Sequence, residues 1–348
     1  RNKPRRKTGA PKGKSVSGCD GGHTPHPALA EGLHHHQAGR LAEAEALYRQ
    51  ALEARPDDPD ALHLLGMAAF QAGQPEAAVS LVQQALTVNP DAAQAHNTLG
   101  SALRAQEETA AACEAFRRAV ALAADYAEGW YNLGITTPDS DEALAALRRA
   151  VALNPGFAPA WNNLGNLLME QGHEEAAAEA LSRAIEAQPD FAEAHYNLGN
   201  LSRRQGDSAA AMDAFREALK HNPDFAEAHN NLGLALLAQD RDDAATDAID
   251  AFSRALAIRP GYAQAHNNLG NALKVRGDTD AAIAAYTRAL ELDPDYAEAH
   301  NNLGHALYLM GNLEDGMAEI RRAIVIRQDY AEAHCNLAQL LFLGGDYG

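Results

Sequence analysis

The hydrophobic pattern of the chain repeats about every 34 residues, and the stretch 192–225 displays it most clearly. Apolar or small residues fall at helical spacing in two segments of this stretch, so each segment predicts an amphipathic helix. The two predicted faces consist of Ala194, Leu198, Gly199 and Leu201, and of Ala211, Phe215, Ala218 and Leu219. Between them, "GDS" at 206–208 predicts a turn followed by a helix N-cap, and Pro223 predicts the end of the second helix.

The period divides the chain after residue 24 into nine repeats and a half. The boundaries fall at 25–58, 59–92, 93–126, 127–157, 158–191, 192–225, 226–262, 263–296 and 297–330, with a half repeat at 331–348. Repeat 127–157 is three residues short and carries Pro138, which we expect to end its first helix a turn early. Repeat 226–262 is three residues longer than the period of 34, and the additional residues lie around "DRDDAATDAID". We expect both changes to be tolerated, because three residues make nearly one helical turn.

Small residues recur where the two helices of a repeat come closest, and large apolar residues recur beside them. The small positions are Gly66/Ala78, Gly100/Ala112, Gly165/Ala177, Gly199/Ala211, Gly233, Gly270/Ala282 and Gly304/Gly316. The large positions are Tyr48, Phe116, Leu181, Phe215, Phe252, Tyr286 and Ile320. This helix-turn-helix pattern resembles the tetratricopeptide repeat (TPR) family over about 25–348. The resemblance implies an all-α, right-handed solenoid.

An asparagine precedes the central leucine in seven consecutive repeats, and we call this set the asparagine ladder. Its members are Asn132, Asn163, Asn197, Asn231, Asn268, Asn302 and Asn336. The preceding position varies and reads Tyr131, Asn162, Tyr196, Asn230, Asn267, Asn301 and Cys335. Asparagine lowers helix stability by up to ~0.7 kcal/mol relative to alanine, so its retention favours a function over a neutral solvated stripe. Three residues further on, Asn166, Asn200 and Asn271 share the same face.

In the TPR arrangement this position lies on the inner side of the first helix, in the concave groove. An amide carries both a donor and an acceptor, which match the backbone of an extended peptide whatever its side chains. The ladder resembles the superhelical arm of the protein O-GlcNAc transferases, whose inner asparagines hold the substrate backbone. Thr98, Leu64 and Ala30 fill the position in the first three repeats, so the expected site extends over about 127–340.

Charge is distributed unevenly along the chain. Seven basic residues and no acid lie within 1–14, so the remainder carries about −25 of the net charge of −18 (−18 minus 7). We expect the Gly-, Pro- and Lys/Arg-rich stretch 1–24 to be a disordered tail. An odd number of dispersed cysteines, with no apolar run of membrane length, favours a cytoplasmic protein without disulfides. The acidic body and the lack of aromatic residues in the tail argue against nucleic acid as a partner.

Other candidate chemistry in the sequence has simpler explanations. "TGAPKGKS" at 8–15 lacks the spacing, strand and helix of a phosphate-binding loop. The histidines at 34–36 point about 100° apart on a helix and cannot meet at one metal ion. A second series comprises His96, His195, His229, His266, His300 and His334, with Trp130 and Trp161 at the same position. Because tryptophan shares the position, we interpret it as a packing position. We predict no catalytic residue, cofactor or metal.

The sequence therefore predicts a protein–protein interaction module that binds an extended segment of another protein through the asparagine ladder. One alternative is the substrate-selecting arm of an O-GlcNAc transferase-like enzyme whose catalytic domain lies beyond residue 348. A second alternative is a structural assembly scaffold. The last predicted helix presents Leu337, Leu340, Leu341 and Leu343 without a second helix to cover them, so we also expect self-association through this face.

Overall fold

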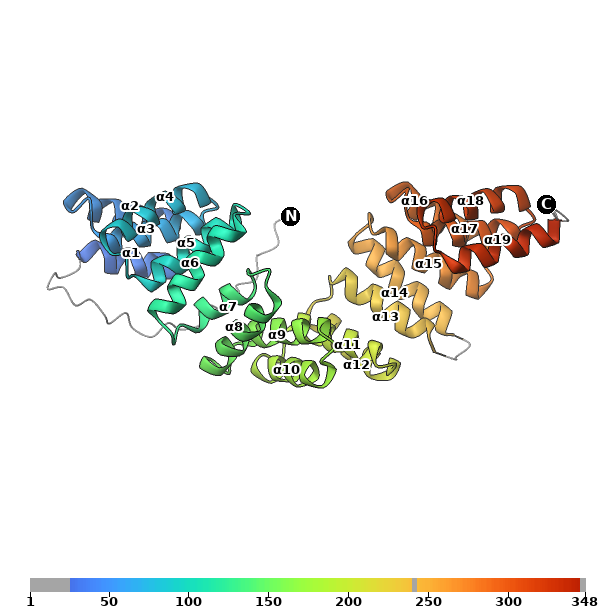
Figure 1. The fold of residues 1–348 in the computed structure, drawn as a ribbon, viewed down its shortest axis with the longest axis horizontal. Helices are drawn as coiled ribbons and strands as arrows, with labels where there is room; N and C mark the ends of the chain where they lie inside the picture. Colours follow the sequence, from blue (N-terminus) through green and yellow to red (C-terminus); the bar gives the residue numbers. More distant parts are fainter. Residues whose placement is uncertain (1–25, 240–242, 345–348) are drawn as a thin grey trace. The chain divides into compact units, whose positions relative to one another are not determined.

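The structure, a computed structural model, describes residues 26–239 and 243–344. The predicted basic tail, the phosphate-loop-like stretch 8–15 and Cys19 lie outside the described residues, as does the side chain of Leu343. The described residues form nineteen α-helices and no strand, which confirms the all-α prediction (Figure 1). Consecutive helices pair into hairpins, and within each of the two units described below the hairpins stack in chain order, as expected for a TPR solenoid.

The helices alternate between the first and the second helix of each repeat. Their bounds are α1 Pro27–Gln37, α2 Leu41–Ala54, α3 Pro59–Gln71, α4 Pro75–Val88, α5 Ala93–Ala105, α6 Thr109–Leu122, α7 Ala127–Gly134, α8 Ser140–Leu153, α9 Ala158–Glu170, α10 Glu174–Ala187, α11 Ala192–Arg204, α12 Ser208–His221, α13 Ala226–Leu237, α14 Ala244–Ile258, α15 Ala263–Arg276, α16 Thr279–Leu292, α17 Ala297–Leu309, α18 Leu313–Ile326 and α19 Ala331–Gly344.

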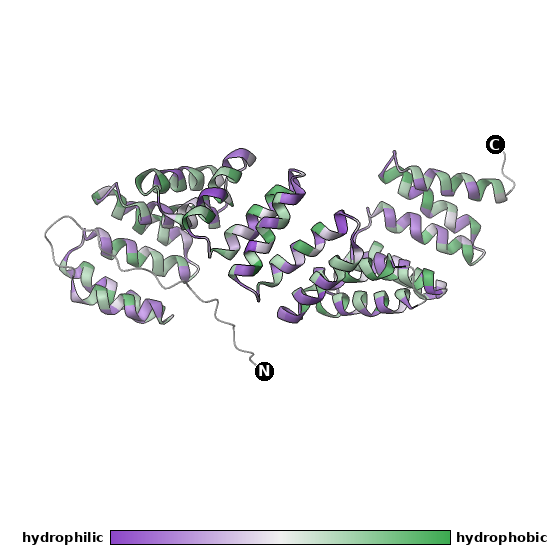
Figure 2. Ribbon diagram, turned by 90° about the horizontal axis from the view of Figure 1, so that it is seen from below, coloured by the Kyte–Doolittle hydropathy of each residue, from purple (hydrophilic) through white to green (hydrophobic). Residues whose placement is uncertain are grey.

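The chain divides into two compact units, Arg1–Leu122 with α1 to α6 and Ala123–Gly348 with α7 to α19. Within each unit, the first helices of adjacent repeats contact each other, as α3 contacts α5 and α15 contacts α17. The second helices of adjacent repeats form no comparable contact among the described residues. The first helices therefore form the inner layer of each unit. Apolar and hydrophilic residues alternate around the helices, which lets each helix bury one face against its neighbours (Figure 2).

Close packing within each hairpin depends on the paired small and large residues. A Cβ atom built on Gly199 would lie 2.6 Å from the ring of Phe215, and one on Gly270 would lie 2.5 Å from the ring of Tyr286. Both aromatic side chains are fully buried. The large residue therefore fills the space that glycine leaves free, which is the physical basis of the sequence pattern.

Each irregular repeat departs from the others in one feature. Repeat 127–157 has a short first helix, and repeat 226–262 has a longer segment between its two helices. Helix α7 has only eight residues, whereas the other first helices that precede a second helix have 11 to 14. Pro138 lies in the loop between α7 and α8. In the long repeat, α13 ends at Leu237 and α14 begins at Ala244, so the segment between them contains the residues 240–242 that are not described.

The last helix buries more of its apolar face than the sequence suggested. Leu340 is 2% exposed and packs with Ile320 and Ala323 of α18, and Leu337 packs against the same cluster. The expectation that Leu340 is uncovered is therefore wrong, because α18 of the preceding repeat covers it. Phe342 is the exposed large residue at this end, with 66% of its surface accessible.

Replacing Gly316 with alanine tests a hairpin contact in which two backbones approach each other directly. The new Cβ would lie 2.7 Å from the carbonyl oxygen of Gly304, and backbone cannot move aside as a side chain can. We expect Gly316→Ala to lower the free energy of unfolding by ~1–3 kcal/mol, despite the better helix propensity of alanine. Urea denaturation measures the change. Gly261→Ala is the matched control, since nothing lies within 4 Å of its Cβ position; equal stabilities of the two variants would contradict the packing argument.

Candidate functional site

The asparagine ladder forms hydrogen bonds between adjacent repeats. In six consecutive pairs, the side-chain amide of a ladder asparagine donates to the side chain that occupies the preceding position of the repeat before it. The bonds are Asn163 to Tyr131 Oη (3.2 Å), Asn197 to Asn162 Oδ1 (2.9 Å), Asn231 to Tyr196 Oη (3.1 Å), Asn268 to Asn230 Oδ1 (2.9 Å), Asn302 to Asn267 Oδ1 (2.9 Å) and Asn336 to Asn301 Oδ1 (2.9 Å). The first helices are thereby joined along the inner layer.

These bonds give the ladder asparagines a structural role between repeats, in addition to the groove position expected from the sequence. Asn268 is only 7% exposed, and the other ladder residues are half-buried rather than free in the groove. The cost of asparagine in a helix is offset by a bond worth ~1 kcal/mol to the neighbouring repeat. We therefore expect replacement of a ladder asparagine by alanine to lower the stability of the array.

The variation at the preceding position has a chemical explanation. Tyrosine and asparagine differ in size, but each places an oxygen within reach of the next amide. The asparagines at this position are buried, with Asn230 at 0% and Asn301 at 1% exposure. Alternation between two acceptor side chains was the signal in the sequence that this pairing exists, and sequence reasoning missed it.

The ladder amides still carry an unused acceptor. Among the described residues, the Oδ1 atoms of Asn197, Asn268 and Asn302 accept no side-chain hydrogen bond, and none of them is a buried unpaired atom. Because the amide nitrogen is fixed by its bond to the preceding repeat, the carbonyl oxygen is held in one direction and remains accessible to solvent. Asn231 differs, since it also donates to Asn200 Oδ1 and accepts from Asn230.

The three additional asparagines do not act alike. Asn200 accepts the bond from Asn231 at 2.8 Å, and Asn271 accepts a bond of 2.8 Å from the hydroxyl of the buried Tyr286. Asn166 differs from both, because its Oδ1 atom is buried and has no partner. Asn132 lies half-buried on the short helix α7.

The same pairing occurs once in the unit Arg1–Leu122. His63 and Thr98 occupy the two equivalent positions, and His63 Nε2 lies 2.9 Å from Thr98 Oγ1. Burial lowers the pKa of His63 to about 4, so its imidazole is neutral at pH 7. The inter-repeat bond is therefore not confined to asparagine, although the run of asparagines begins at Asn132.

The histidine and tryptophan series holds the turns that connect the repeats. In each case a ring nitrogen lies within hydrogen-bonding distance of the backbone carbonyl six residues earlier. The bonds are His96 to Pro90 (2.9 Å), Trp130 to Ala124 (3.0 Å), Trp161 to Pro155 (2.9 Å), His195 to Pro189 (3.0 Å), His229 to Pro223 (3.1 Å), His266 to Pro260 (3.0 Å), His300 to Pro294 (3.0 Å) and His334 to Gln328 (2.9 Å). Both ring types supply an N–H at the same place, which explains their exchange.

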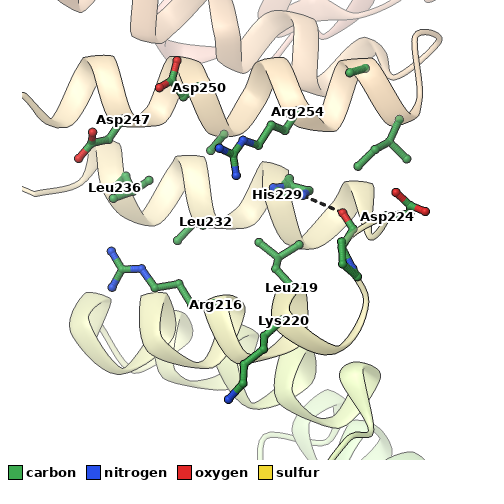
Figure 3. Close-up of a pocket in the computed structure, with 14 residues that line it drawn as sticks. Arg216, Leu219, Lys220, Asp224, His229, Leu232, Leu236, Asp247, Asp250 and Arg254 are labelled. Carbon is green, nitrogen blue, oxygen red and sulfur yellow. Dashed lines mark hydrogen bonds between the residues drawn. The ribbon is translucent and has the colours of Figure 1, made fainter.

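Two clefts lie between successive second helices, with the histidine position at their base. One, of about 650 Å³, is lined by α12, α13 and α14, and His229 lies at its centre beside the guanidinium of Arg254 (Figure 3). The other, of about 870 Å³, is lined by the equivalent helices α16, α17 and α18. There His300 also contacts Glu319, with 2.6 Å between Nδ1 and Oε2. The rims of both clefts carry mixed charges.

A partly buried lysine lies on the inner layer near the last repeats. Burial lowers the pKa of Lys274, and Glu332 opposes that shift. Burial also lowers the pKa of His305, with Lys274 acting in the same direction. The described residues contain no group of three or more His, Cys, Asp or Glu side chains arranged to hold a metal ion. No helix in the described part of the chain has the length and apolar character needed to cross a membrane.

Stacked helical hairpins with small/large packing and inter-repeat bonds along the first helices define an α-solenoid repeat protein. Models described as "Tetratricopeptide repeat" match residues 35–102, 93–126, 139–190, 162–220, 196–263, 245–283 and 297–330, and one described as "TPR repeat" matches 270–311. The chain belongs to the tetratricopeptide repeat family. The matches leave a gap at 127–138, which includes the short helix α7.

Several solved structures are similar to this chain. The Cut9–Hcn1 hetero-tetramer of APC/C has a TM-score of 0.59 at 15% identity, over 90% of this chain and 75% of that chain. YrrB, "a TPR protein with an unusual peptide-binding site", has a TM-score of 0.46 at 25% identity, over 56% of this chain and 98% of that one. A thermophilic TPR protein of Thermus thermophilus, TTC0263, has a TM-score of 0.44 at 23% identity, over 53% and 99%. No curated protein matches in sequence. The resemblance to O-GlcNAc transferases rests on the asparagine ladder alone.

Exchanging His266 tests the bond that holds the turn. His266→Phe removes the N–H that reaches the Pro260 carbonyl at 3.0 Å, and we expect it to lower the free energy of unfolding by ~1 kcal/mol. His266→Trp keeps an N–H at this place, as Trp161 does, and should lower the free energy of unfolding by less than His266→Phe. Urea denaturation compares the two variants. If phenylalanine is tolerated better than tryptophan, the position serves packing alone.

The partly buried His63 makes the first unit sensitive to acid. Between pH 6.5 and about 4, the unfolded chain binds a proton that the folded imidazole does not, so stability falls as the pH falls. The loss is roughly 3 kcal/mol at most. Hydrogen exchange in α3 and α5 of the whole protein should accelerate over this range. In His63→Leu the acceleration should shrink, and an unchanged pH profile would contradict the assignment.

Proposed function

We propose that the chain binds an extended segment of another protein along its inner layer of first helices, through the carbonyl oxygens of the asparagine ladder. Membership of the TPR family suggests a protein–protein interaction or scaffold role. The observation that carries the finer proposal is the fixed orientation of the ladder amides. At Asn197 and Asn302, the amide donates to the preceding repeat and leaves its oxygen accessible.

A row of oriented acceptors suits the N–H groups of an extended backbone. Such a segment presents its N–H groups at regular spacing and independently of its side chains, so contacts to the main chain give affinity with little sequence preference. Preorientation favours binding, because the amides lose little rotational freedom when the peptide arrives. Asn231 contributes less in this mechanism, since its own oxygen already accepts from Asn230.

The test separates groove contacts from inter-repeat bonds. Asn197→Ala with Asn302→Ala removes two inter-repeat bonds and two groove carbonyls. The matched control, Asn162→Ala with Asn267→Ala, breaks the same two bonds at their acceptor ends, at positions that are only 7% and 4% exposed. Both doubles should lose comparable stability.

The affinity for a peptide should distinguish the ladder double variant from the control double variant. A 15-residue peptide selected from a random library against the native chain serves as the probe, together with its backbone N-methylated form. We expect the ladder double to bind about thirtyfold more weakly, from two bonds of ~1 kcal/mol each, and the control to change only a few-fold. N-methylation should weaken binding more than exchange of the peptide side chains. Equal affinities of the two doubles, measured by calorimetry, would refute the role of the ladder.

A further inference from the structure

The short helix α7 leaves an opening beside the ladder. Helix α7 ends at Gly134, about a turn earlier than other first helices, and a cavity of about 410 Å³ lies between its end and α9. We call this cavity the notch. It lies between the end of α7, the loop with Thr137 and Pro138, the beginning of α8, and Asn163, Asn166 and Glu170 of α9.

The notch presents hydrogen-bond acceptors that the described protein leaves unused. The Oδ1 atom of Asn166 is buried and has no partner, which is rare for a buried polar atom and points to a missing donor. Asn163 donates its amide to Tyr131, and its oxygen accepts no bond from the described residues. The Thr137 hydroxyl is already engaged, since it donates to Glu142 and accepts from the amide of Asp139.

The side chains that line the notch carry one negative charge, which favours a cation as the ligand. Its lining includes the carboxylate of Glu170, which forms no ion pair with a described residue, and includes no lysine, arginine or histidine. Arg204 donates to the carbonyl of Met169 at 3.0 Å and is not part of the lining. Ile135, Leu147 and Leu167 supply apolar walls that suit the aliphatic stem of a long basic side chain.

We propose that the notch binds a basic side chain, arginine or lysine, of the peptide held by the asparagine ladder. The guanidinium or ammonium group donates to Asn166 Oδ1 and to the Glu170 carboxylate, while the stem lies along the apolar walls. The notch shares Asn163 with the ladder, so it fixes the register of a peptide that backbone contacts alone leave free to slide. This inference deepens the proposed function and, for the peptide, rests on it.

Small probes test the notch without any peptide. N-acetyl-arginine N-methylamide and its lysine analogue are titrated into ¹⁵N-labelled protein, with the side-chain amide of Asn166 as the reporter. The neutral citrulline and norleucine analogues serve as ligand controls. We expect saturable shifts with the two basic probes and at least fivefold weaker binding of citrulline and norleucine. The preference should weaken as salt is added, because the carboxylate is exposed. Equal binding of citrulline and arginine would overturn the assignment of a cation.

Variants then locate the contact. Glu170→Gln and Asn166→Leu should each weaken the arginine probe about fivefold, and Asn166→Asp should strengthen it by adding a second negative charge. Glu175→Gln is the matched control, since it removes one exposed carboxylate from the neighbouring helix α10 and should change nothing. A loss in Glu175→Gln as large as that in Glu170→Gln would mean that the acidic surface attracts cations without a site.

The peptide experiment distinguishes failure of the notch from failure of the proposed function. Selected peptides should carry arginine or lysine at one fixed position, and Glu170→Arg should replace that preference with an acidic residue. If the ladder double weakens the peptide but Asn166→Leu does not, the notch is wrong and the groove stands. If the basic probes bind the notch but the ladder double keeps full peptide affinity, the groove is wrong and the notch stands as a site for cations alone.

Discussion

Close approach between the first helices of adjacent repeats is the constraint on which the other features depend. The first helices of adjacent repeats contact each other, as α11 contacts α13, and small residues such as Ala194 and Ala228 are fully buried on these helices. At that separation an asparagine in one repeat reaches a tyrosine or asparagine in the repeat before it, as Asn302 reaches Asn267. The same bond fixes the direction of the amide that the proposed groove uses. Stability and recognition therefore depend on one set of side chains.

Most of the fold could be predicted from the sequence because it repeats local information. Helix spacing, the glycine at the closest approach and the large residue beside it each follow from packing within about 34 residues, and Gly199 with Phe215 illustrates them. The bonding of the ladder could not be derived in this way, because Asn197 and Asn162 lie 35 residues apart and on different hairpins. The available signal was chemical, since tyrosine and asparagine, which both carry an acceptor oxygen, alternate at the six positions from Tyr131 to Asn301 that accept these bonds.

The histidine series shows a similar limit. The sharing of this position with tryptophan correctly indicated a structural role, but it could not distinguish filling of space from a bond to the backbone. The exchange of His195 with Trp161 across repeats is explained by their shared ring N–H and not by their volumes. In the same way, the three-residue deficit predicted a shorter helix, yet not that the lost turn opens a polar cavity at Asn166. The sequence shows that residues are missing from a repeat. Which side chains this leaves exposed depends on the neighbouring repeat.

The hydrogen bonds of the ladder all run in the same direction along the chain, and this affects how repeats can be added or lost. Every bond runs from an amide to the acceptor of the repeat before it, from Asn336 in α19 to Tyr131 in α7. Each of the five repeats from 158–191 to 297–330 thus carries one donor for its predecessor and one acceptor for its successor. Gene duplication or loss of a whole repeat preserves this matching, because any two repeats of this kind can be joined in the same order. The number of such repeats can therefore change, whereas the donor side of each repeat must always face the acceptor side of the repeat before it.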